Sequence, residues 1–140
     1  KYVYAGLGLG WALKDTAYED GRLAAYALSQ RGNKTALPVL IEGTQSQDRL
    51  SQQYGMFGLA LFKTKASSAA IADAILKTAQ LGRLGIQSLQ RQGTADAARS
   101  LGRVLSEGTA SNKAAALQAL RRMKVPEAKA VLRAAGKSTT

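Results

Sequence analysis

The sequence predicts an all-α protein, an α-solenoid of about four helical hairpins preceded by one helix. Three observations lead to this prediction. Apolar residues recur at helical spacing along most of the 140 residues. A pattern of two helices returns at a period of about 31 residues. No segment alternates apolar and polar residues as a half-buried strand does. We therefore expect one domain that covers residues 1–140.

The repeat is clearest between residues 86–101 and 117–132, and equivalent apolar positions can be followed through all four hairpins. One column holds Leu28, Leu59, Leu89 and Leu120, a second holds Ala36, Ser67, Ala97 and Ala128, and a third holds Leu40, Ile71, Leu101 and Leu132. The steps are 31, 30 and 31 residues. Since neighbouring units of a helical repeat stack on each other, these columns are expected to set the fold.

The chain order of the predicted elements follows from this register. Residues 2–13 form a lone N-terminal helix, the four hairpins span residues 19–43, 48–81, 82–108 and 111–136, and residues 137–140 form a tail. The lone helix occupies the place of a second helix whose first helix is absent. Its GLGLG run can also be taken for a phosphate-binding loop, but the glycine spacing is not G-x-G-x-x-G and no strand precedes it.

Capping residues predict where the helices begin and end. The predicted helix starts are Asp48, Ser67 or Ser68, Thr94 or Ala95, and Ser111 or Asn112. The predicted stops are the glycines Gly43, Gly93, Gly108 and Gly136. Pro38 and Pro126 are expected inside first helical turns, where the missing N–H does no harm. The helix from Asp48 to Phe62 carries an apolar stripe of Leu50, Tyr54, Phe57 and Leu61, flanked by Met56 and Leu59.

The hairpins resemble HEAT repeats. The segments ALQALRRMKVPEAKAVLRAAG and IQSLQRQGTADAARSLGRVLSEG are similar to that family's first helix, turn and second helix. The second unit departs from the pattern through Ser67 and a Lys-Thr-Lys turn, and the family's frequent Asp at the turn is missing from all four units. The resemblance implies a right-handed superhelical stack whose second helices line a concave face. HEAT-like solenoids include DNA glycosylases, but their active-site residues cannot be mapped onto this chain.

Composition argues against an enzyme. The chain contains no Cys and no His, which excludes disulfides, thiolate zinc sites, Cys nucleophiles and the commonest general base. The nine carboxylates are scattered, mostly near helix ends, and form no paired-carboxylate motif. We therefore expect no catalytic residue, no metal site and no cofactor. The longest apolar stretch, residues 2–13, is too short to span a bilayer, and no feature indicates a cellular compartment.

Positive charge concentrates in the C-terminal half. The net charge is +11, and residues 81–140 hold eleven basic and three acidic residues. This surplus favours an acidic partner, or it serves only solubility. The candidate partner-binding patch comprises Arg91, Arg99, Arg103, Arg121, Arg122, Lys129 and Arg133. Arg99 and Arg103 share one helix face, and so do Lys129 and Arg133, but the two pairs are offset by one position in the repeat, about 100° around the helix.

These features predict a non-enzymatic scaffold or adaptor that binds another macromolecule, foremost a protein. The alternative is sequence-independent binding of nucleic acid through the basic C-terminal half. Residues 63–140 contain no aromatic residue, which argues against base stacking. The aromatics of the first half either fill the core or form a docking face. The lone helix at residues 2–13 is expected to be covered by another part of a longer chain, a second copy or a partner protein.

Overall fold

A computed structural model of the chain describes residue 27 and residues 37–138. Seven α-helices and a short 3-10 helix make up this described part, which contains no β-strand, so the all-α prediction is confirmed. The lone helix predicted at residues 2–13 and residues 19–36 of the first predicted hairpin lie outside the described residues, apart from Ala27. No helix in the described part is long and apolar enough to cross a lipid bilayer.

Backbone contacts divide the chain into two compact units, Lys1–Phe62 and Lys63–Thr140. In the first unit, α3 (Leu37–Thr44) packs against α4 (Arg49–Leu61). The crossing is close because it is made of glycines: a Cβ at Gly55 would lie 2.7 Å from the carbonyl oxygen of Leu40. Gly43 also faces α4, since a Cβ added there would lie 3.2 Å from the Ser51 carbonyl oxygen. The predicted helix stop at Gly43 is therefore wrong, because α3 continues through this glycine to Thr44 and uses it for packing.

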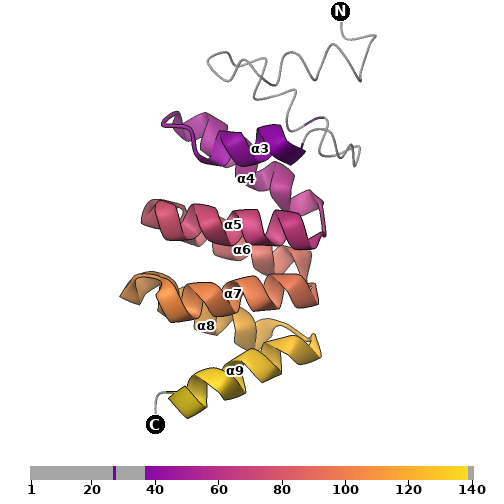
Figure 1. Ribbon diagram of the computed structural model, residues 1–140, viewed down its shortest axis with the longest axis vertical. Helices are drawn as coiled ribbons and strands as arrows, with labels where there is room; N and C mark the ends of the chain where they lie inside the picture. Colours follow the sequence, from indigo (N-terminus) through magenta and orange to yellow (C-terminus); the bar gives the residue numbers. More distant parts are fainter. Residues whose placement is uncertain (1–26, 28–36, 139–140) are drawn as a thin grey trace, which may run out of the picture. The chain divides into compact units, whose positions relative to one another are not determined.

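The second unit consists of two layers of helices. One layer contains α5 (Lys65–Lys77), α7 (Ala95–Glu107) and α9 (Pro126–Ser138), which pack side by side in this order (Figure 1). The other layer contains α6 (Gly82–Gln92) and α8 (Ala110–Arg122), which pack against each other behind the first layer. The hairpin α6/α7 spans residues 82–107 and the hairpin α8/α9 spans residues 110–138, where helix pairs are predicted over residues 82–108 and 111–136. A single domain of four stacked hairpins stays a prediction.

The apolar columns of the repeat are buried at every described position except Leu132. Leu59, Leu89 and Leu120 are at most 1% exposed. The second and third columns are also buried at Ser67, Ala97, Ala128, Leu40, Ile71 and Leu101, while Leu132 is half-buried. The register of the repeat therefore identified core positions in both units. The apolar stripe predicted on α4 is wrong, because Leu50 and Phe57 are exposed and the flanking Met56 and Leu59 form the core.

Threonines start three of the five helices in the second unit. The hydroxyl oxygens of Thr64, Thr94 and Thr109 accept hydrogen bonds from the backbone N–H three residues later, at distances of 3.1 to 3.2 Å. The predicted start at Thr94 or Ala95 is confirmed. The predicted starts at Ser67 or Ser68 and at Ser111 or Asn112 are wrong, because Thr64 and Thr109 supply the caps and the helices begin earlier.

The remaining helix ends show two different uses of glycine. Gly93 ends α6 in a left-handed conformation with φ 63°, as predicted. Gly136 does not end the last helix, because α9 continues to Ser138. After α5 ends at Lys77, the 3-10 helix η2 (Ala79–Leu81) leads directly into α6. Pro126 is the first residue of α9, as expected for a residue without an N–H.

Candidate functional site

The seven candidate cations are divided between the two layers of the second unit. Arg99 and Arg103 lie on α7, and Lys129 and Arg133 lie on α9. Arg91 lies in the last turn of α6, and Arg121 and Arg122 in the last turn of α8. The predicted set is thus two groups of cations, one along the α5/α7/α9 layer and one at the C-terminal ends of the helices in the other layer.

The two cations on α7 are compensated by carboxylates. Arg99 Nη2 lies 2.8 Å from Asp96 Oδ1 on the same helix, and Arg103 Nη2 lies 2.8 Å from Asp73 Oδ1 on α5. Each contact is a hydrogen-bonded ion pair at the surface. A guanidinium that already shares its charge with a carboxylate attracts an acidic partner less strongly. Arg99 and Arg103 are therefore the weaker members of the predicted set.

The other five cations are exposed, and none of them forms an ion pair with a described residue. They are Arg91, Arg121, Arg122, Lys129 and Arg133. The positions of Arg91 and Arg122 are equivalent in the repeat, and both stand at helix C-termini, where a positive charge interacts favourably with the helix dipole. This favourable placement is sufficient to explain the three arginines on α6 and α8 structurally, whereas Lys129 and Arg133 lie on the exposed side of α9 without such a role.

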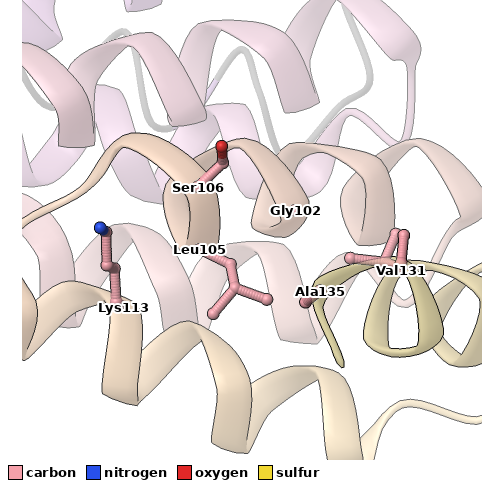
Figure 2. Close-up of a pocket in the computed structure, with 7 residues that line it drawn as sticks. Gly102, Leu105, Ser106, Lys113, Val131 and Ala135 are labelled. Carbon is pink, nitrogen blue, oxygen red and sulfur yellow. The ribbon is translucent and has the colours of Figure 1, made fainter. Parts of the chain in front are cut away.

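An open apolar groove of about 550 Å³ lies between α7, α8 and α9. Figure 2 shows its lining: Gly102, Leu105 and Ser106 from α7, Lys113 from α8, and Val131 and Ala135 from α9. Leu105 and Val131 supply the apolar surface, and Lys113 is exposed at one side. Gly102 brings the two helices of one layer together, since a Cβ there would lie 3.0 Å from Val131 Cγ1. The groove offers apolar contact beside one positive charge.

The groove was not predicted from the sequence, because it depends on small side chains rather than on a charged or catalytic motif. Ser106 and Ala135 stand at the positions that Leu76 and Val104 occupy one repeat earlier. The smaller side chains at these positions, compared with the equivalent positions one repeat earlier, are the sequence signal that indicates the groove. Large residues at these positions would narrow the space between α7 and α9.

The described residues contain no group of three or more His, Cys, Asp or Glu side chains that could hold a metal ion. The carboxylates Asp73 and Asp96 are each engaged with an arginine, and Asp48 accepts a hydrogen bond from the Ser51 hydroxyl at 2.8 Å. The expectation that the chain has no catalytic residue and no cofactor stays a prediction.

Comparison with protein-family models, curated proteins and solved structures found no match to this chain.

Proposed function

We propose that this chain is a non-enzymatic scaffold or adaptor that binds a partner protein. The observation that carries the proposal is the availability of charge: five exposed cations of the second unit have no carboxylate partner among the described residues. Exposed charges of one sign raise the rate and specificity of association with a surface of the opposite sign. The partner surface should therefore be acidic.

We further propose that the second unit belongs to a HEAT-like α-solenoid. Its two layers of helices, with α5, α7 and α9 in one and α6 and α8 in the other, support this interpretation. The burial of equivalent positions at 30- or 31-residue steps supports it as well. Repeat proteins of this kind bind partners over extended surfaces rather than at a single enclosed site.

Affinity capture from a cell lysate, with and without nuclease, tests the proposal. The bait is the full 140-residue chain, and the test variant carries Arg91→Gln, Arg121→Gln, Arg122→Gln, Lys129→Gln and Arg133→Gln. The control carries Arg99→Gln and Arg103→Gln, which remove two cations that are already paired. We expect a protein that survives nuclease treatment and that is lost with the test variant but retained with the control. Equal capture by both variants, or no captured protein, would contradict the proposal.

Sequence-independent nucleic-acid binding is the second candidate, because the same five cations are also suited to contact phosphates. Such binding should fall steeply with salt, since neutralising phosphates releases condensed counterions. An electrophoretic mobility shift of duplex DNA at about 50 mM and about 200 mM salt measures this. No shift at the lower concentration would exclude this function, and a shift that the five-glutamine variant abolishes would support it.

A further inference from the structure

The groove between α7, α8 and α9 has an equivalent one repeat earlier, between α5, α6 and α7. The repeat steps of 30 and 31 residues place Leu105 at the position of Ile75, Lys113 at that of Gly82 and Ala135 at that of Val104. The earlier residues are covered: Ile75 is 1% exposed, Val104 is 0% exposed and Gly82 is buried. Their counterparts are half-buried at Leu105 and Ala135 and exposed at Lys113. The same location is thus closed in one repeat and open in the next.

The first turn of α8 occupies the earlier location. Asn112, the third residue of α8, is 7% exposed, and its Nδ2 donates a hydrogen bond to the Ala79 carbonyl oxygen at 3.1 Å. Its side chain lies directly against Gly82, where an added Cβ would overlap the amide group. Beyond this turn, α8 packs along α6 and α7. The closed site is therefore filled by the first turn of a helix.

The open groove differs from its closed equivalent in charge. Where Gly82 leaves room for the neutral amide of Asn112, the groove presents the ammonium group of Lys113, which forms no ion pair with a described residue. A helix that enters here in the manner of α8 brings its third residue to this ammonium group. A carboxylate at that position would pair with Lys113, and acidic residues are also favoured in the first turn of a helix by its dipole.

We propose that the groove binds the first turn of an amphipathic helix from a partner protein, with an Asp or Glu of that turn paired to Lys113. Apolar residues of the same helix contact Leu105 and Val131, which line the groove. This inference rests on the proposed protein-binding function and names the chemistry of the partner: a helix with an acidic first turn and an apolar face.

A peptide built from this chain tests the proposal. It copies residues 109–123, which include the helix that fills the equivalent site, and carries Asn112→Glu. The control peptide carries Gln118→Glu instead, which gives the same net charge but puts the carboxylate at a position that is exposed in α8. Fluorescence anisotropy of each labelled peptide with the full chain gives the two dissociation constants. We expect the Asn112→Glu peptide to bind about three- to fivefold more tightly, as one solvent-exposed ion pair provides.

Matched variants of the full chain locate the binding. Lys113→Glu should abolish the preference for the Asn112→Glu peptide, and Lys129→Glu, with the same change in net charge, should retain it. Ser106→Trp places a large side chain at the rim of the groove and should weaken binding at least about tenfold, whereas Ser106→Ala should leave it unchanged. Far-UV circular dichroism verifies that each variant is folded. Equal binding of both peptides, or a preference that survives Lys113→Glu, would overturn the proposal.

Two further outcomes distinguish a partner helix in the groove from a second copy of the chain and from a partner that binds elsewhere on the surface. Sedimentation equilibrium that shows self-association of the chain, abolished by Ser106→Trp, would assign the groove to a second copy and overturn the proposal. If affinity capture retrieves the same nuclease-resistant protein with wild type, Lys113→Glu and Ser106→Trp, the groove proposal fails while the scaffold function stands.

Discussion

Arg103 on α7 and Asp73 on α5 occupy equivalent positions of successive repeats and form an ion pair, with 2.8 Å between Nη2 and Oδ1. Of the two ion pairs among the described residues, this one joins two helices, whereas the pair of Arg99 and Asp96 lies within α7. This position of the repeat thus carries an acidic side chain on α5 and a basic side chain on α7, so the neighbouring units attract each other at their surface. The same column continues to Ala134 on α9, which carries no charge.

The interhelical ion pair should contribute little to stability. The Arg103 side chain is 41% exposed and the Asp73 side chain 57%, so water screens the pair. A double-mutant cycle of Arg103→Gln and Asp73→Asn, measured by urea unfolding, should give a coupling energy below about 1 kcal/mol. A coupling above about 2 kcal/mol would show that the pair is a main determinant of helix packing.

A buried polar network should matter more. The Ser68 hydroxyl donates to Gln92 Oε1 at 2.7 Å, and Gln92 Nε2 donates to Ser67 Oγ at 3.1 Å. All three side chains are at most 3% exposed. Gln92→Met removes the acceptor of the buried Ser68 hydroxyl and one of the donors to the Ser67 hydroxyl, and we expect a loss of about 1–3 kcal/mol in the free energy of unfolding, measured in urea.

The control for this network is taken from the next repeat, where Ala97, Ala98 and Met123 stand at the equivalent positions. The double variant Ser68→Ala and Gln92→Met removes the Ser68 hydroxyl group together with its partner and keeps Ser67, whose hydroxyl group also bonds to the backbone of Thr64. It should therefore recover most of the stability that Gln92→Met loses, because the buried hydroxyl group that donated to Gln92 is removed as well. A double variant less stable than Gln92→Met would contradict this account.

Two glycines in helices should respond to alanine in opposite ways. A Cβ at Gly82 would overlap the Asn112 side chain, so Gly82→Ala should destabilise the fold by about 1–3 kcal/mol. A Cβ at Gly136 would have no atom of a described residue within 4 Å, and Gly136→Ala should stabilise α9 by about 0.5–1 kcal/mol. Thermal unfolding followed by circular dichroism measures both. Stabilisation by Gly82→Ala would show that Asn112 can move away freely.

The threonine caps offer a fourth test. Thr94→Ala removes the hydroxyl oxygen that accepts the Ala97 N–H at 3.1 Å, and it should cost about 1 kcal/mol in urea unfolding. Thr94→Ser keeps an acceptor at the same place and should remain within about 0.5 kcal/mol of wild type. If both substitutions cost the same, the contribution of Thr94 comes from its methyl group and not from the cap.

Several features of the fold could be predicted because they depend on residues close together in the chain. Gly93, Thr94 and Pro126 mark helix ends through their own backbone and side-chain chemistry, and the structure agrees at each. Thr64 and Thr109 were missed because Ser67 and Asn112, themselves good capping residues, stand three positions further on. In the structure these two residues lie at the third position of their helices and are recruited for packing.

Other features depend on contacts between distant segments and could not be predicted. Glycine is a residue type that commonly ends helices, and only the close approach of Gly43 to α4 explains why α3 continues through it. All seven candidate cations lie on helices, but the sequence does not indicate the carboxylates that pair with Arg99 and Arg103. The groove beside Lys113 needs three helices to define it, and spacing within one helix does not reveal it.

The network of Ser67, Ser68 and Gln92 has a consequence for how the chain assembles. Hairpins that share the same apolar columns have more than one way to pair with each other during folding. A pairing displaced by one unit would set the Gln92 amide against Ala97 and Ala98, which have no side-chain hydroxyl group, and would leave the buried Ser68 hydroxyl, which donates to Gln92 in the native pairing, facing methionine. Each unsatisfied group costs about 1–3 kcal/mol. The network therefore favours the native pairing of α6 with α5 over a pairing displaced by one unit.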